Sequence, residues 1–315
     1  MRKHLDIALD ALIPHYEIRH PVLWDECFHE KKPVEVEIGA GLGEFLVKKS
    51  QENPDTNFIA IEQQWKRAKR ILRKVKVARQ QHEGFEDNLR VLRADATIVF
   101  ERFFSPSVIR KVFCLFPCPW PKKKHIKYRL FSRDFFRLAN SRLIKKGEMI
   151  IVTDFLPYFE WMKEEVEGCG FQTKTRIVKP QFDTKFERKW CAQGKKEFYE
   201  LHLVKTRHIA VAVKKDVSLK NYFVKNFIPE RFSFTNKKGE TSIVLKEFLF
   251  DPENNKAMVR LLVSEKNISQ HLWVMIAKQK ARWRVSKAEG HPILPTEGVT
   301  AALESVFKEV NKTVF

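Results

Sequence analysis

A glycine-rich loop follows directly on a short run of alternating, β-branched residues. The run 34–38 predicts a strand, Gly39, Gly41 and Gly43 come next, and a helix opens at Glu44. Glycines at such a turn let the backbone approach a ligand where a Cβ atom would clash. The spacing differs from the dinucleotide fingerprint, in which the third glycine comes one residue later. A strand, a glycine turn and a helix together favour a loop that binds an adenosine cofactor, and a simple tight turn is the alternative.

Three carboxylates lie at or near the ends of the first three predicted strands. Glu37 comes just before the glycine turn, where it would repel a pyrophosphate but attract a sulfonium and an ammonium group. Glu62 ends the second strand, where its carboxylate can accept from both hydroxyls of a ribose. Asp95 follows the third strand and is placed to bind an adenine amino group. A helix cap or a solvated turn is the alternative for each of them alone. Together they favour S-adenosylmethionine over NAD.

A basic, proline-rich segment follows the predicted strand 112–116. It runs Pro-Cys-Pro-Trp-Pro and continues into lysines at 122–124. The end of such a strand lies next to the switch point of an α/β sheet, where ligands bind. The prolines stiffen the loop, and Trp120 offers a stacking face for a base. A solvated run of charge is the alternative. We expect phosphate contacts from five side chains of this segment, Lys123, Lys124, His125, Lys127 and Arg129.

The composition indicates a globular protein with a polyanionic partner. Its 315 residues are 43% hydrophobic and 31% charged, and 59 Lys and Arg against 39 Asp and Glu leave a net charge of +20. A surplus of this size favours nucleic acid or an anionic surface over a small neutral metabolite. No run of 18 apolar residues is present, and the N-terminus lacks a signal-peptide pattern. We therefore expect a cytoplasmic protein without a membrane anchor, and the sequence leaves its oligomeric state open.

The five cysteines predict neither a disulfide framework nor a metal site. Their number is odd and their spacing irregular. Cys114 and Cys118 are close together, but no second pair of ligands follows at zinc spacing. We expect reduced thiols and no metal.

Strands and helices alternate over the first 205 residues. Expected strands are 34–38, 57–62, 89–92, 112–116 and 148–153, with helices that include 64–82 and 128–144. Two last strands, 171–178 and 197–204, have no predicted helix between them and read as an antiparallel hairpin at the sheet edge. This order predicts an α/β fold with a doubly wound, Rossmann-like sheet whose last strand is antiparallel.

The sequence pattern changes after residue 205. Residues 206–315 alternate like strands between turn signals, and 297–312 predicts a helix. This part carries 19 Lys and Arg against 11 Asp and Glu, so it is basic like the rest. We expect three parts: an N-terminal arm with a helix at 1–30, the α/β domain at 31–205, and at 206–315 a small basic α+β domain that binds the same polyanion.

Over roughly residues 30–204 the sequence resembles the bacterial tRNA (guanine-N7-)-methyltransferase family. The shared motifs are Glu-Ile-Gly-x-Gly-x-Gly at 37–43, Ile-x-Ile-Glu at 59–62, Pro-Trp-Pro-Lys-Lys at 119–123 and Thr-x-Phe-Glu at 184–187. The resemblance implies a class I, S-adenosylmethionine-dependent methyltransferase fold. It implies methyl transfer to N7 of the variable-loop guanosine at position 46 of tRNA, which makes tRNA the expected partner.

The resemblance also implies roles for individual residues. Glu37, Glu62 and Asp95, with the three glycines, would bind the methyl donor. Contacts with the substrate guanosine or its backbone would come from Lys122, Asp154, Thr184, Lys185, Phe186 and Glu187.

One position departs from the family pattern. The family has an acid just before Pro-Trp that is taken as catalytic and donor-binding, and here that residue is Cys118. Guanine N7 has a lone pair and no proton, so its attack on a sulfonium methyl needs positioning rather than a general base. Losing one charged hydrogen bond costs about 1.5–3 kcal/mol, and Asp154 or Glu187 could replace it. Two alternatives stay open: a tRNA-binding relative without turnover, and a methyltransferase for another RNA position.

Overall fold

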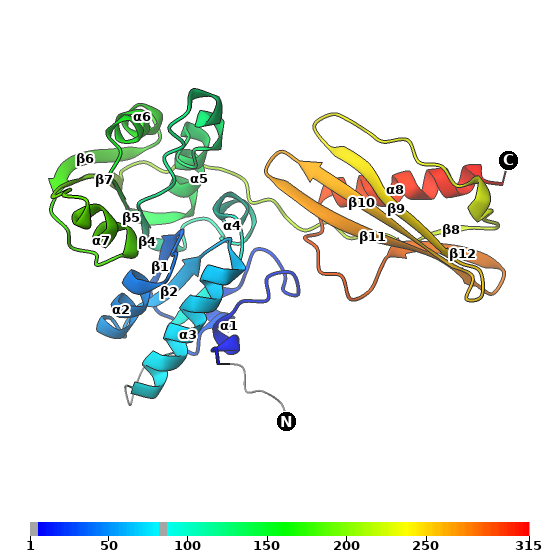
Figure 1. Cartoon of the computed structure of the whole chain (residues 1–315), viewed down its shortest axis with the longest axis horizontal. Coiled ribbons are helices and arrows are strands. Elements are labelled where there is room, and N and C mark those ends of the chain that lie inside the picture. The colour runs from blue at the N-terminus through cyan, green and yellow to red at the C-terminus, as the bar shows by residue number, and fades with distance from the viewer. Residues whose placement is uncertain (1–5, 82–86, 315) are drawn as a thin grey trace. The chain divides into compact units, whose positions relative to one another are not determined.

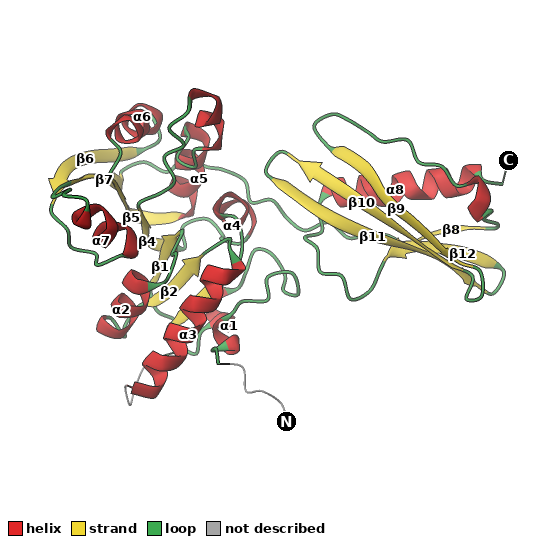
Figure 2. Cartoon of the chain, viewed as in Figure 1, coloured by secondary structure: helices red, strands yellow, loops and turns green. Residues whose placement is uncertain are grey.

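The computed structural model describes residues 6–81 and 87–314. The chain divides into two compact units, the first ending at Lys214 and the second beginning at Lys215 (Figure 1, Figure 2). No helix in the described ranges has the length and apolar character needed to cross a bilayer.

The first unit is built on a seven-stranded sheet. Its strands are β1 (Val34–Ile38), β2 (Asn57–Ile61), β3 (Leu89–Leu92), β4 (Ile109–Leu115), β5 (Leu143–Thr153), β6 (Phe171–Val178) and β7 (Phe198–Lys205). Their order is β3-β2-β1-β4-β5-β7-β6. Neighbours from β3 to β5 are parallel, and β7 is antiparallel to both β5 and β6. The predicted doubly wound sheet with an antiparallel last strand is confirmed.

Helices cover the sheet on both sides. They are α1 (Trp24–Cys27), α2 (Glu44–Glu52), α3 (Trp65–Gln81), α4 (Ala96–Arg102), α5 (Arg133–Arg142), α6 (Leu156–Val166) and α7 (Lys185–Ala192), with 3-10 turns η1 (Leu9–Ala11) and η2 (Lys123–Tyr128). The predicted apolar stripe of α3 is buried from Ala68 to Ala78, so it docks the helix on the core formed with α2, β2 and β3. The basic side chains of α3 consequently lie on its outer faces.

Three expectations about elements were wrong. The helix expected at 128–144 spans only Arg133–Arg142, and β5 begins at Leu143. The stretch 143–147 is a bulge, because β5 advances from Leu143 to Glu148 while β4 advances only from Ile109 to Lys111. Helix α4 was not expected. Helix α7 interrupts the expected hairpin of β6 and β7, although these strands do pair antiparallel.

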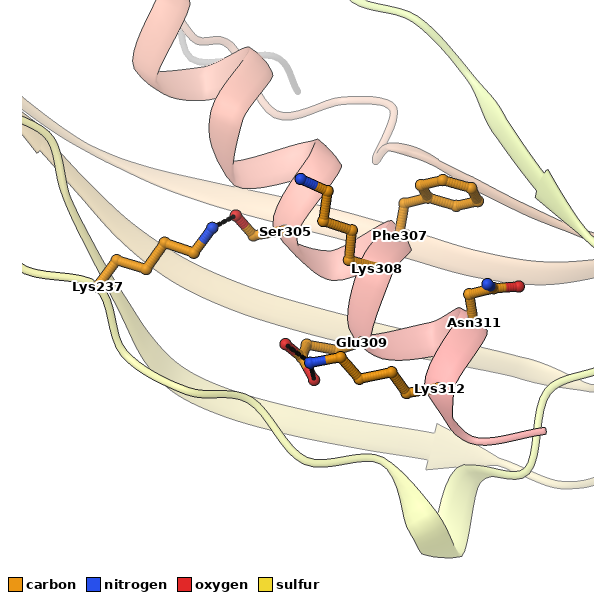
Figure 3. Close-up of a pocket in the computed structure, with 7 residues that line it drawn as sticks. All are labelled: Lys237, Ser305, Phe307, Lys308, Glu309, Asn311 and Lys312. Atoms are coloured by element: carbon orange, nitrogen blue, oxygen red, sulfur yellow. Dashed lines mark hydrogen bonds and ion pairs between the residues drawn. The ribbon is translucent and has the colours of Figure 1, made fainter. Parts of the chain in front are cut away.

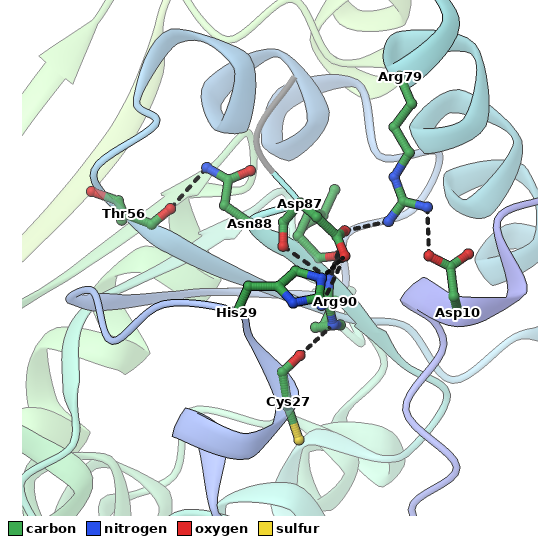
Figure 4. A network of polar contacts seen from close by, with 9 residues as sticks. Asp10, Cys27, His29, Thr56, Arg79, Asp87, Asn88 and Arg90 are labelled. Carbon is green, nitrogen blue, oxygen red and sulfur yellow. Dashed lines mark hydrogen bonds and ion pairs between the residues drawn. The ribbon is translucent and has the colours of Figure 1, made fainter. Parts of the chain in front are cut away.

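A polar network ties the N-terminal residues to the first unit (Figure 4). Arg79 of α3 donates to Asp10 of η1 at 2.6 Å and also bonds to Asp87. Arg90 of β3 donates to Asp87 at 2.8 Å and, through Nε, to the carbonyl of Cys27 at 2.6 Å. These bonds fix the arm against α3 and β3.

Residues just beyond 205 also pack on the first unit. Arg142 is fully buried and donates to the carbonyls of Phe100, Val211 and Ala212 at 2.8, 2.9 and 3.2 Å. A buried guanidinium needs such partners, and the loop after β7 supplies two of them. The first unit therefore ends at Lys214, nine residues past the boundary that the sequence predicts at 205.

The second unit is a five-stranded antiparallel sheet with one long helix. Its elements are β8 (Tyr222–Val224), the 3-10 turn η3 (Pro229–Arg231), β9 (Ser242–Asp251), β10 (Lys256–Glu265), β11 (Ile268–Gln279), β12 (Arg282–Lys287) and α8 (Glu297–Lys312). The strand order is β8-β12-β11-β10-β9. The core lies between α8 and one face of this sheet. The predicted α+β architecture of strands followed by a helix is confirmed.

Candidate active site

The glycine loop joins β1 to α2 in a conformation that suits glycine. Gly39, Gly41 and Gly43 all have positive φ, at 70°, 56° and 69°. A Cβ atom on Gly39 would meet no atom within 4 Å, so the space beside it is open. A Cβ atom on Gly43 would come within 3.0 Å of Ile71, so this glycine permits close packing of α2 on α3. The first two glycines remain the ones that fit an approaching ligand.

Glu62 holds the glycine loop. Its side chain is buried after β2, where Oε2 accepts from the amide of Gly41 at 3.0 Å and Oε1 from that of Gln64 at 2.9 Å. An Arg67 nitrogen lies 3.9 Å from Oε2. Glu62, which is predicted to bind the ribose, therefore also shapes the glycine loop.

Glu37 is a buried carboxylate with an unsatisfied oxygen. The residue is 3% exposed, and its Oε2 has no hydrogen-bond partner. Burial, followed by the charges of Glu62 and Glu44, raises the pKa of Glu37 to about 8. A buried polar atom without a partner is costly, and a bound cation at this position would offset that cost. The site fits a cationic ligand.

Asp95 lies after β3 and caps α4. Its Oδ1 accepts from the amides of Thr97 at 2.9 Å and Ile98 at 3.4 Å. The helix-cap alternative is thus realised, but both bonds use one oxygen. The second oxygen makes no hydrogen bond within the described ranges, so a ligand contact remains open to it.

The proline-tryptophan segment leaves the end of β4. Cys118 is exposed and its thiol is free. The Trp120 ring packs on His125 and Tyr128 of η2, with ring centroids 5.7 and 5.3 Å apart. Lysines on and before η2 are exposed and have no ion-pair partner among the described residues; they are Lys122, Lys123, Lys124 and Lys127. The segment therefore offers a group of uncompensated positive charges.

Arg129 corrects the expected phosphate contact. The residue is only 8% exposed, and its Nε donates to the carbonyl of Pro119 at 3.0 Å. Its guanidinium lies 5.0 Å from the ring centroids of both Tyr158 and Trp161. The guanidinium is thus held between aromatic rings and the loop backbone, which leaves little of the residue open to a phosphate. Arg129 positions the segment.

Thr184 and Glu187 both have hydrogen-bond partners inside the protein. The Thr184 hydroxyl caps α7 by accepting from the amide of Glu187 at 3.2 Å. Glu187 is 2% exposed, with Oε1 accepting from Gln181 at 2.8 Å and Oε2 from Phe182 at 2.9 Å. These side chains shape the loop before α7, and their contact with the substrate guanosine stays a prediction.

The remaining predicted substrate residues lie around the same rim. The amide of Lys185 donates to Glu44 Oε2 at 2.6 Å, and Arg188 pairs with the same glutamate, so α7 docks on α2. Phe186 is 37% exposed. Asp154 follows β5 and is half-buried, and its carboxylate has no partner in the described part of the chain. Lys195 donates to the Asp154 carbonyl.

Glu44 was missed by sequence reasoning. It links α2 to α7, and its charge also raises the pKa of Glu37. The available signal was an acid in the first turn of the helix behind the glycine loop. In the described ranges no three His, Cys, Asp or Glu side chains gather as metal ligands would.

The sequence comparisons with known proteins agree on one family. The methyltransferase family model Methyltransf_4 matches residues 31–200. A tRNA (guanine-N(7)-)-methyltransferase of Chlorobium phaeobacteroides is 42% identical over 176 residues, 56% of this chain and 83% of that one. The protein of the same name from Coprothermobacter proteolyticus is 28% identical over 306 residues, 92% of this chain and 90% of its own. Among solved structures, the 16S rRNA methyltransferase KamB aligns with 60% of this chain and all of its own, at 16% identity and a TM-score of 0.46.

Proposed function

This chain belongs to the tRNA (guanine-N7-)-methyltransferase family, and we propose that it transfers a methyl group from S-adenosylmethionine to N7 of a tRNA guanosine, at variable-loop position 46. The observation that carries the donor site is Glu37, a buried carboxylate whose Oε2 lacks a partner. Bound S-adenosylmethionine supplies a sulfonium-activated methyl group next to a cationic amino-acid moiety. Ionised Glu37 would pair with that positive charge, which explains why a buried acid is kept there.

Two further carboxylates complete the proposed donor site. Glu62 already accepts two backbone amides, and a carboxylate has about four acceptor positions, so ribose hydroxyls can still bind to it. Asp95 has one oxygen outside the α4 cap for an adenine amino group. Glu62 follows β2, the neighbour of β1, and Asp95 follows β3, the next strand along, so both lie at the same ends of the parallel strands as Glu37.

The acceptor side needs positioning more than proton transfer. N7 of guanine attacks with its lone pair, and no proton leaves that atom, so no side chain has to act as a base. The sequence offers two residues, Asp154 and Glu187, that could replace the family acid missing at Cys118. Glu187 is committed to backbone amides, whereas Asp154 is unpaired and follows β5, the neighbour of β4. We therefore assign the grip on the guanine edge to Asp154.

The basic segment would bind the tRNA backbone. Its four exposed lysines lie between the end of β4 and α5, close to where the base must enter. A base in a folded tRNA has to leave its stack to bring N7 to a methyl group. Phosphate contacts by these lysines would hold the backbone while the base moves, and they would weaken steeply with salt.

The test is a methyl-transfer assay on an unmodified tRNA transcript, with the product nucleoside identified by mass spectrometry. Wild type, Cys118→Asp and Asp154→Asn are compared. We expect N7-methylguanosine from the wild type, and a loss of about 10- to 150-fold for Asp154→Asn, the value of one charged hydrogen bond. Product only from Cys118→Asp would instead favour a tRNA-binding relative that lost turnover at this position. A different methylated nucleoside would contradict the assigned N7 site.

A further inference from the structure

The sheet of the second unit is covered by its helix on one face only. Along β10 the side chains of Val259, Leu261 and Val263 are fully buried in the core with α8. The residues between them point to the other face and are only partly buried. This second face, the open face, is formed by alternate residues of all five strands.

The strand register places apolar and aromatic side chains across the open face, with methionines on its inner strands. Met275 of β11 pairs with Met258 of β10, which pairs with Leu249 of β9. Leu249 is 51% exposed, and Phe223 of β8, at the other end of the sheet, is 40% exposed. Trp273 comes two residues before Met275 on the same face and is half-buried. The second unit thus keeps large apolar side chains at its surface.

Arginines flank this apolar centre on both sides. The Arg282 guanidinium lies 3.8 Å from the ring centroid of Phe223. Arg260 lies 5.6 Å from the Trp273 ring and pairs with Glu247 at 3.0 Å. Arg284, opposite Phe223 in the register, has a buried Nε with no hydrogen-bond partner. Aromatic rings with stacked arginines are the groups that bind bases and phosphates of unpaired nucleotides.

We propose that the open face is a second RNA-binding surface, on which unpaired nucleotides of the tRNA stack on Trp273 and Phe223 while the arginines bind their phosphates. This inference rests on the proposed function, because it takes tRNA as the substrate. Charge complementarity favours RNA over a second copy of the chain. Three arginines and Lys256 lie on the face against Glu247 and Asp251, so two such faces would repel each other.

The cleft on the helix side of this unit does not compete with the open face. It has a volume of about 460 Å³ and is lined by Lys237, Ser305, Phe307, Lys308, Glu309, Asn311 and Lys312 (Figure 3). Its Lys237 donates to Ser305 at 2.8 Å, and Lys312 donates to Glu309 at 2.9 Å. Two of its three lysines are thus already engaged within the protein.

The experiment measures tRNA affinity of the full chain with Trp273→Leu, Trp273→Phe and Arg284→Gln. Arg231→Gln is the matched control, because Arg231 is exposed on η3 outside the sheet. We expect Trp273→Leu to weaken tRNA binding about 5- to 150-fold, the range for one lost stacked base, and Trp273→Phe to restore most of it. Arg284→Gln should reduce the salt slope of binding by about one, as loss of one phosphate contact does. S-adenosylmethionine affinity and the melting temperature should stay near wild type.

Equal tRNA affinity for wild type and all three variants would overturn the proposal while leaving the methyltransferase assignment intact. Loss of affinity in Arg231→Gln as large as in Arg284→Gln would also overturn it, because the effect would then be general charge. A dimer that Trp273→Leu dissociates would show that the face binds a second copy instead. Absence of tRNA binding and methyl transfer by the wild type would be a failure of the proposed function itself.

Discussion

Glu37 and Glu187 are both buried glutamates near the ends of the parallel strands, and they differ in what their oxygens contact. Glu187 is 2% exposed and accepts from the backbone amides of Gln181 and Phe182. Glu37 is 3% exposed, and its Oε2 has no partner. Residue type is the same and exposure is nearly so, but the hydrogen bonds of the two side chains differ. The satisfied carboxylate shapes a loop, and the unsatisfied one is where a ligand is expected.

This difference is energetic. A buried carboxylate that accepts backbone N–H bonds recovers much of its desolvation cost within the fold. A buried carboxylate without them remains costly until a cation binds, and in the free protein that cost appears as the raised pKa of Glu37. Mutations at the two positions should therefore act on different quantities: ligand affinity at Glu37 and folding stability at Glu187.

Glu37→Gln should have the largest effect on donor binding. The substitution keeps the shape but removes the negative charge, so S-adenosylmethionine affinity should fall about 10- to 150-fold, the value of one charged hydrogen bond. Calorimetric titration measures it, with Glu52→Gln on the exposed end of α2 as a control. Unchanged affinity would remove Glu37 from the donor site.

The same variant should not destabilise the fold. The folded pKa of Glu37 is about 8, above its unfolded value, so at pH values between the two the folded chain binds more protons than the unfolded chain. The stability that this group contributes to the wild type is therefore lost as pH rises through 8. In thermal unfolding experiments, Glu37→Gln should lack this pH-dependent loss of stability. A melting temperature well below wild type at pH 8 would contradict the account.

Glu187→Gln should act mainly on stability. It leaves amides of Gln181 and Phe182 without a charged acceptor in a buried position, which should cost about 1–3 kcal/mol of unfolding free energy. Denaturant unfolding measures the loss, and donor affinity should stay within about twofold of wild type. A variant with normal stability and lost guanosine binding would reassign Glu187 to the substrate.

Thr184→Ala should show a smaller effect of the same kind. It removes the N-cap of α7, whose loss typically costs about 1 kcal/mol. Thr184→Ser keeps the hydroxyl and should restore stability in the same unfolding experiment. Failure of serine to do so would mean that the methyl group, and not the cap, matters there.

The sequence was sufficient to predict the elements with a regular apolar pattern and the ligand site beside them. The buried stripe of α3 and the strand alternation of β1 predicted both elements, and a glycine loop with three carboxylates predicted where a ligand would bind. The α+β architecture of the second unit could also be predicted, because its sequence shows strand-like alternation and its helix begins at a threonine cap, Thr296.

The sequence was insufficient where a residue's partner is distant in the chain. Arg129 belongs to a basic run, and only the fold places it between Tyr158 and Trp161. Glu187 is part of a family motif, yet its oxygens bind amides of a turn that sequence does not reveal. The bulge at 143–147 was hidden because its lysines and Gly147 resemble the end of a helix.

The most direct test of the central claim is to count protons released when S-adenosylmethionine binds at pH 7. Calorimetry in two buffers of different ionisation enthalpy gives this number, and Glu37→Gln subtracts the protons released by the ligand. With a pKa of about 8, Glu37 is mostly protonated before binding and must ionise to pair with a cation. The account predicts that wild type releases about one proton more than the variant. Equal proton release by the two proteins would contradict it.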